Sequence, residues 1–218
     1  MGLSLTVGLL ASLRRHDSEQ SIAHYRKEFD TLNRYLLKRN LPVHFEPERC
    51  ETWGMDMGGY FALHYLRRLA AHWDHHGKLP APGDREAAKD PLLQSYYRSW
   101  ERGDLDRNFD HLVIHSDAEG YYLPVWLPAV LVPGEAYPVA GGYVGSSPRL
   151  LEECITLAKA LRLPLDTSLG SEEVLEAERN QGKGHRLWQR YGVECGALLR
   201  LMHGAAHSVR TGAALVFG

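Results

Sequence analysis

The spacing of apolar residues changes along this chain from helical to extended and back to helical. Spacings of three and four residues predict amphipathic helices, whereas strict alternation predicts half-buried strands. Helical stripes begin at Ile22, Phe61, Leu93, Leu150 and Trp188. Between the third and the fourth of these stripes, the chain instead forms short extended runs separated by proline and glycine. This order predicts a central β region with helices before and after it.

Capping signals mark where several of the helices begin. Asp17 to Gln20 has the pattern of a capping box. Asp90-Pro91 and Ser147-Pro148 each place a capping side chain before a proline in the first helical position. Ser171 is the predicted cap of a short acidic helix that ends at Arg179.

The two ends of the chain are predicted strands that can lie in one sheet. Leu3 to Leu9 alternate with polar or small residues, and residues 211–217 form a closing strand after a long helix over 184–209. The predicted fold is therefore α+β (or mixed α/β), with a central sheet that contains a hairpin and about five to six flanking helices. We expect a single compact domain over residues 1–218, whose strand order does not follow from the pattern.

Charge and cysteine content exclude several classes of function. The net charge is −2 and Lys and Arg are spread along the chain, so no nucleic acid is expected as a partner. The apolar N-terminal run is too short for an anchor and has no charges before it, so neither a membrane nor a signal peptide is expected. Cys50, Cys154 and Cys195 form no close pair, which favours reduced thiols and a cytoplasmic protein. The last two are expected to be small buried residues.

The segment from Asp110 to Tyr122 concentrates the most side chains capable of chemistry. Two strands, 112–115 and 121–127, are predicted to form a hairpin, which would place His111 and His115 on one strand face. Carboxylates in the turn could join them to hold a divalent metal or to pair a base with an acid. Turn formation and packing explain the same residues without chemistry. The candidate binding residues in this segment are His111, His115, Asp117, Glu119, Tyr121 and Tyr122.

Three further groups are weaker candidates. His203 and His207 have the i, i+4 spacing of metal-binding histidines, but Gly204 stands where metalloproteases have glutamate. A histidine cluster over 72–76 is better explained by the dipole at a helix C-terminus. Ser146 and Ser147 open a helix whose free N–H groups could bind an anion, although helix capping already accounts for them.

Three segments of the sequence resemble a group of small uncharacterised bacterial proteins. They are the start MGLSLTVG, the centre HSDAEGYYLPV and the later run GSSPRLLEE. The resemblance spans nearly the whole chain and implies no activity. Small bacterial proteins of this size include immunity and partner-binding proteins, an analogy of fold and size alone.

Two functions follow from these observations, and they leave open whether the protein is an enzyme. The first is a non-catalytic partner- or ligand-binding protein, of immunity or regulatory type, because no catalytic motif is present. Its partner would be another protein, in an oligomeric state that the sequence does not give. The alternative is a metal-dependent hydrolase, in which a divalent metal held by the 110–122 segment activates water.

Overall fold

The structure is a computed structural model that describes residues 3–16, 19–83, 86–104 and 107–218. It has the predicted α+β class and divides into two compact units. The sheet unit comprises Leu3–Asp56, His115–Leu151 and His203–Gly218, and the helical unit comprises Met57–Ile114 and Glu152–Met202. The expectation of one domain over the whole chain stays a prediction.

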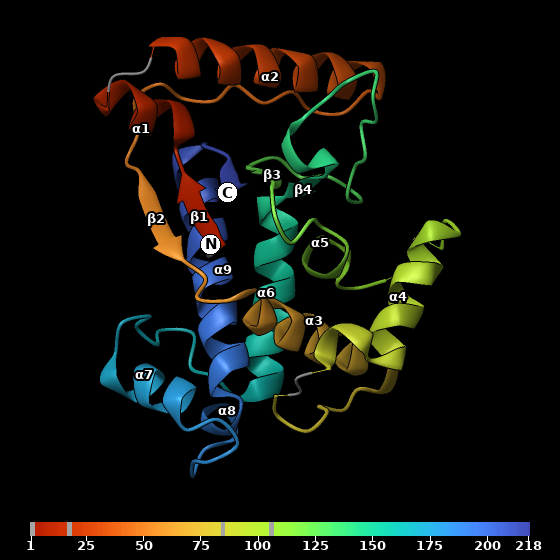
Figure 1. Cartoon of the computed structure of the whole chain (residues 1–218), viewed down its shortest axis with the longest axis vertical. Coiled ribbons are helices and arrows are strands. Elements are labelled where there is room, and N and C mark those ends of the chain that lie inside the picture. Colours follow the sequence, from red (N-terminus) through yellow and green to blue (C-terminus); the bar gives the residue numbers. More distant parts are fainter. Residues whose placement is uncertain (1–2, 17–18, 84–85, 105–106) are drawn as a thin grey trace. The chain divides into compact units, whose positions relative to one another are not determined.

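The sheet unit contains a mixed five-stranded sheet in the order β2-β1-β5-β3-β4 (Figure 1). The strands are β1 (Ser4–Val7), β2 (Trp53–Asp56), β3 (Gly120–Leu123), β4 (Val144–Ser146) and β5 (Leu215–Phe217). β5 pairs antiparallel with both β1 and β3, and β3 pairs parallel with β4. The two terminal strands are therefore neighbours in one sheet, as the sequence suggested, while β2 lies in a segment for which no strand was predicted.

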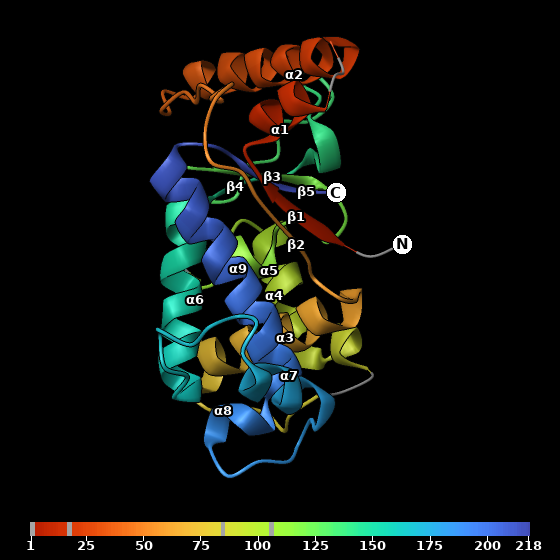
Figure 2. The same cartoon turned by 90° about the vertical axis from the view of Figure 1, so that its left-hand side faces the viewer.

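Two helices of the sheet unit lie on one side of the sheet (Figure 2). They are α1 (Leu9–Arg15) and α2 (Glu19–Lys38). Phe29, Leu32 and Leu36 of α2 form a common core with Tyr121 and Leu123 of the central strand β3. Leu9 belongs to α1 instead of extending the first strand, and the predicted capping box at 17–20 begins outside the described residues.

The helical unit is built from short and medium helices. They are α3 (Tyr60–His76), α4 (Pro91–Glu101), α5 (Asp110–Val113), α7 (Glu172–Arg179) and α8 (Leu187–Arg190). Helices α6 (Ser147–Leu161) and α9 (Gly192–Thr211) contribute residues to both units. The 3₁₀ turns are η1 (Ala87–Lys89) in this unit and η2 (Ala140–Gly142) in the sheet unit.

The described part of the chain has nine α-helices instead of about five to six. Of the additional helices, α5 includes residues expected to be extended, and α1 begins at Leu9, the last residue of the expected first strand. The third arises because the long last helix is interrupted at Tyr191, whose φ and ψ of −107° and 43° are not helical. The hydroxyl of Tyr191 donates to the carbonyl of Pro80 at 2.6 Å, so a tertiary contact holds the break. Phe61, expected inward on α3, is 56% exposed.

Asp90 connects two helices of the helical unit. Its Oδ1 accepts from the N–H groups of Leu92 and Leu93 at 2.9 and 3.2 Å, which caps α4 as predicted. Its Oδ2 lies 3.0 Å from Arg68 Nε and 3.0 Å from His72 Nε2 on α3. His72 therefore serves this contact and not a solvent-facing helix end. Burial alone would raise the pKa of Asp90, but the hydrogen bonds from His72, Arg68 and Leu93 outweigh it and hold that pKa below its usual value.

Replacing Asp90 by asparagine is expected to lower the free energy of unfolding by about 1–2 kcal/mol at pH 7. A carboxyl with a lowered pKa in the folded state stabilises the protein above its unfolded pKa, near 4, and loses that contribution as the pH falls further. Urea unfolding from pH 7 to pH 3 should thus show the two proteins converging below about pH 4. Asp166→Asn, at an exposed carboxyl, is the control. A constant difference across this range would contradict the assignment.

Candidate functional site

The predicted 110–122 hairpin does not form. Residues Asp110–Val113 are helical, and only Gly120–Leu123 form a strand, which pairs with β4 and β5. The helix is held from outside its own sequence, because the Glu153 carboxylate on α6 accepts from the N–H groups of His111 and Leu112 at 3.1 and 2.7 Å. His111 and His115 therefore do not share a strand face, and the arrangement from which the metal site was inferred is absent.

His115 is a buried packing residue of the sheet unit, only 1% exposed. Its ring stacks on Tyr122 with the centroids 4.0 Å apart and meets Phe217 edge to face. Its Nδ1 and Nε2 lie 3.1 Å from the carbonyl oxygens of Ser116 and Tyr121. Gly145 lacks the side chain that would collide with the Tyr122 ring, which explains why glycine precedes Ser146.

The remaining residues of the 110–122 segment divide between turn and core. The Ser116 hydroxyl accepts from the N–H groups of Ala118 and Glu119, which leaves Glu119 exposed at the surface. Asp117 is half-buried in the same turn. Tyr121 and Tyr122 are at most 1% exposed, and burial raises the pKa of Tyr121. The tyrosines therefore stabilise the fold and do not present a recognition surface.

Ser146 and Ser147 are both fully buried. Ser146 Oγ donates to the carbonyl of Val125 at 2.8 Å and accepts from Arg149 N, so Ser146 caps the helix in place of Ser147, the predicted cap. Ser147 Oγ donates to the carbonyl of Tyr122 and lies 2.7 Å from Ser208 Oγ. These contacts engage both hydroxyls inside the protein.

The two histidines with i, i+4 spacing lie in different environments. His203 is exposed, whereas His207 is 7% exposed and its Nε2 lies 3.0 Å from the carbonyl oxygen of Glu51. Among the described residues, no group of three or more His, Cys, Asp or Glu side chains is arranged to hold a metal ion. Cys154 and Cys195 are buried, as expected, and burial raises the pKa of both thiols.

The acidic helix α7 presents a different kind of site. Ser171 caps it through a hydrogen bond from Val174 N, and it ends at Arg179, both as predicted. Residues 163–178 contain five carboxylates and neither Lys nor Arg, although Lys and Arg make up 25 of the 218 residues. The carboxylates are Asp166, Glu172, Glu173, Glu176 and Glu178. This stretch is therefore a local concentration of negative charge in a nearly neutral protein.

Close packing against α9 holds α7 in place. Val174 and Ala177 are the buried residues of α7. At Gly192 of α9, a side chain would overlap the backbone carbonyl of Ala177, and at Gly196 it would overlap the carboxylate of Glu178. Glycine at both positions thus lets the two helices approach closely, which orients the opposite face of α7 outward.

Ion pairs neutralise part of the acidic face. Glu172 accepts from Arg179 at 3.1 Å, and Glu178 pairs with Arg200. The carboxylate of Glu176 is exposed and has no hydrogen bond or ion pair within the part of the chain that the structure describes. The Glu172–Arg179 pair is exposed, and since exposed ion pairs contribute little, it can exchange for contacts with another molecule.

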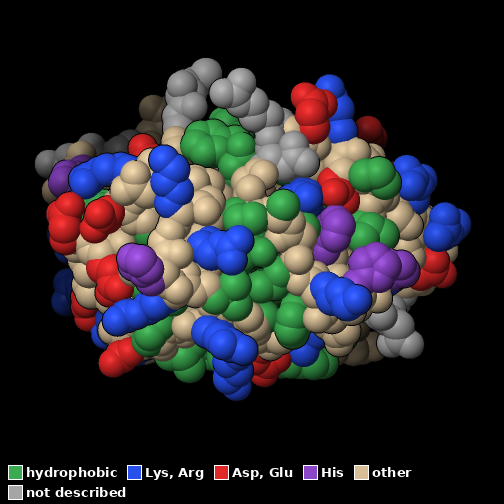
Figure 3. Space-filling view, turned by 90° about the horizontal axis from the view of Figure 1, so that it is seen from below, with side chains coloured by type: hydrophobic (Ala, Val, Ile, Leu, Met, Phe, Trp, Pro, Cys, Tyr) green, Lys and Arg blue, Asp and Glu red, His purple; other side chains and the backbone are tan. Residues whose placement is uncertain are grey.

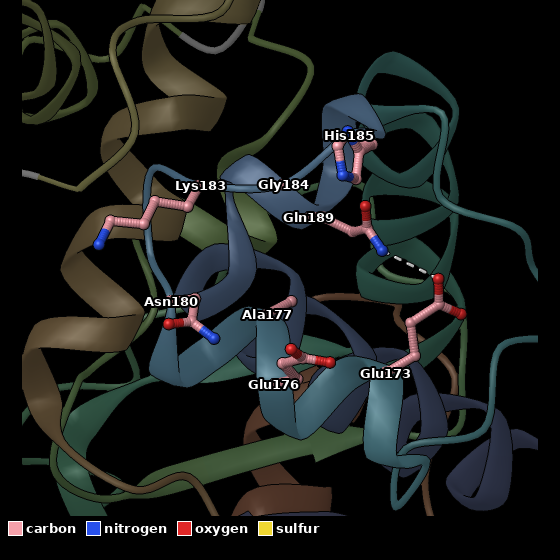
Figure 4. A pocket seen from close by; sticks show the side chains of 8 residues that line it. All are labelled: Glu173, Glu176, Ala177, Asn180, Lys183, Gly184, His185 and Gln189. Atoms are coloured by element: carbon pink, nitrogen blue, oxygen red, sulfur yellow. Dashed lines mark hydrogen bonds between the residues drawn. The ribbon is translucent and has the colours of Figure 1, made fainter.

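A hollow of about 270 Å³ lies between α7 and the loop that leads into α8 (Figure 4). Its lining residues are Glu173, Glu176, Ala177, Asn180, Lys183, Gly184, His185 and Gln189. Oε1 of Glu173 accepts from Arg186 Nη1 and from Gln189 Nε2, each at 2.9 Å. These bonds link the loop to the helix at one side of the hollow.

The surface around these elements carries charges of both signs. In Figure 3, acidic and basic side chains are interspersed over this face of the molecule, and a hydrophobic area lies near its centre. Any negatively charged recognition surface is consequently local. Within the described ranges, none of the helices is both long and apolar enough to cross a bilayer.

The fold and the site define an α+β protein that presents a short, rigidly seated acidic helix. The chain belongs to a family described as "Putative DNA-mimic protein", which matches residues 1–217. Comparisons with curated proteins and with solved structures gave no match.

The family assignment corrects the functions inferred from the sequence. An immunity-type or ligand-binding protein and a metal-dependent hydrolase were both expected, and DNA mimicry is neither of these. An unspecified protein partner was also expected, and the family description indicates mimicry of DNA instead. The acidic helix was recognised in the sequence, but no function was assigned to it. The signal that could have found it is the run without Lys or Arg before Arg179.

Proposed function

We propose that this protein mimics DNA locally, and that α7 occupies the DNA-binding surface of a protein partner. Family membership supplies the class of function, and the charge spacing on α7 is the observation that carries the proposal. A DNA-binding partner is found where DNA is, in agreement with the cytoplasmic location expected from unpaired cysteines.

The carboxylates of α7 are as closely spaced along its axis as the phosphates of one DNA strand. Its eight residues span about 12 Å, over which it carries four glutamates and one arginine, Arg179. One strand of duplex DNA has a phosphate about every 3.4 Å along the axis, or about four over the same length. A net charge of −2 on the whole chain restricts the likeness to this element. Lys and Arg side chains that contact phosphates can therefore contact Glu172, Glu173 and Glu176 in the same way.

Neutralising these three carboxylates tests the proposal. Immobilised wild-type protein should retain DNA-binding proteins from an extract of the source cell, and an added DNA duplex should release them, because both ligands occupy one surface. The variant Glu172→Gln/Glu173→Gln/Glu176→Gln should bind a purified protein so obtained at least about tenfold more weakly.

The matched control removes the same net charge elsewhere. Glu19→Gln/Asp30→Asn/Glu135→Gln alters three exposed carboxylates of the sheet unit and should bind as the wild type does. Retained proteins that a duplex fails to release, or equal binding by both triple variants, would refute the proposal.

A further inference from the structure

We infer that the hollow beside α7 is a receptor for one arginine side chain of the partner. This inference rests on the proposed function and deepens it, since it names the group that the mimic recognises. The charges, the acceptor geometry and the size of the hollow carry it.

The acceptors of the hollow come from two elements. Glu173 and Glu176 lie three residues apart on α7, a spacing that places side chains next to each other on a helix. Asn180 and Gln189, beyond the helix, add side-chain amides. In Figure 4 the amine of Lys183 points away from both carboxylates, so it does not neutralise the acidic side of the hollow.

Several acceptor atoms are available to a ligand. Glu173 uses Oε1 for Arg186 and Gln189, whereas no donor contacts its Oε2 among the described residues. The same holds for both carboxylate oxygens of Glu176. Three carboxylate oxygens on adjacent side chains therefore face an incoming cation, and the same charges disfavour any anion.

The geometry favours a guanidinium over an ammonium group. A guanidinium carries five N–H donors in a planar fork and can contact two carboxylates and an amide oxygen at once, whereas an ammonium concentrates its donors at one point. Glu173 already binds such a group, the guanidinium of Arg186 at 2.9 Å. Arginine also makes the commonest specific contacts of DNA-binding proteins, to guanine, besides contacting phosphates.

The size of the hollow suits one side chain. Pockets for drug-sized molecules usually measure about 300–1,000 Å³, which is more than the roughly 270 Å³ available here. At Gly184 in its wall, φ is +133° and a side chain would lie 2.6 Å from Cβ of Gln189, so glycine is the residue that fits this wall.

Three peptides test the inference on the full-length protein. Acetyl-Gly-Arg-Gly-amide, its lysine counterpart and its citrulline counterpart are titrated against ¹⁵N-labelled protein, and amide shifts are followed by NMR. The arginine peptide should shift amides of α7 and residues 180–189 and bind at least about fivefold more tightly than the lysine peptide. The citrulline peptide, which has the same shape without the charge, should leave the amides unshifted.

Glu176→Gln should weaken the arginine peptide at least about fivefold, while Glu101→Gln, at an exposed carboxyl on α4, should have no effect. Equal binding of the arginine and lysine peptides, or an unchanged affinity in Glu176→Gln, would overturn the inference. The two proposals fail separately. Peptide binding without retention of any DNA-binding protein refutes DNA mimicry alone, whereas retention that is unaffected by Glu176→Gln refutes the arginine receptor alone.

Discussion

Gly192→Ala is expected to lower the free energy of unfolding by about 3 kcal/mol, at the upper end of overpacking substitutions. The added methyl group would overlap the carbonyl oxygen and carbon of Ala177, which are backbone atoms that no rotamer change can move. Alanine is normally the better helix former, so propensity alone predicts the opposite sign. Urea unfolding measures the change, and hydrogen exchange should show the amides of α7 losing protection.

Two other glycines make this result interpretable. Gly170 precedes α7, and no atom lies within 4 Å of the place that a side chain would occupy there. Gly170→Ala should therefore leave the free energy of unfolding within about 0.5 kcal/mol of the wild-type value. At Gly196 the overlapping atom belongs to the flexible Glu178 side chain, so Gly196→Ala should cost less than Gly192→Ala. Equal stability of the Gly192 and Gly170 variants would show that α7 is not seated as described.

Glu153→Gln is expected to lower the free energy of unfolding by about 2–3 kcal/mol. The Glu153 carboxylate is 3% exposed and caps α5 by accepting from His111 N and Leu112 N. Glutamine replaces one acceptor oxygen with a donor, so one buried N–H would face another donor. Thermal or urea unfolding measures the loss, and Glu101→Gln provides the exposed control. A cost below about 0.5 kcal/mol, typical of surface substitutions, would show that the cap does not determine α5.

Local signals in the sequence predicted most of the helices. The bounds of α7 agree with the predicted ones, and Asp90 and Ser171 cap helices as expected. Each of these features depends on residues within a few positions of one another, so a single sequence contains the information. That the two terminal strands lie in one sheet was also anticipated, although their direct pairing was not.

The errors occur where distant residues determine the local structure. α5 replaced a predicted strand because Glu153, some forty residues away in the chain, satisfies its free N–H groups. The last helix is interrupted because Tyr191 bonds to Pro80. Periodicity cannot report such contacts. His115 attracted a functional interpretation for the same reason, since its burial against Tyr122 is visible only in the fold.

The helix of the candidate site was predictable from the sequence, but the hollow beside it was not. The sequence indicates an acidic helix capped by Ser171, yet the hollow depends on the Glu173 contacts with Arg186 and Gln189 that fix the following loop. Gly192 and Gly196 would have predicted a close helix contact, but not with which partner helix. The residues that follow Arg179 therefore received no role from the sequence alone.

The mixture of charges around α7 has a kinetic consequence. Strongly charged partners steer each other and associate at about 10⁸–10⁹ M⁻¹ s⁻¹ at low salt, whereas neutral surfaces associate at about 10⁵–10⁶ M⁻¹ s⁻¹. A chain with a net charge of −2 generates little long-range field, so its encounters with basic proteins are close to random diffusion. Discrimination then depends on how long a complex lasts, because only a surface that fits α7 and its loop dissociates slowly. Such a protein would leave most DNA-binding proteins undisturbed and retain the few that match it.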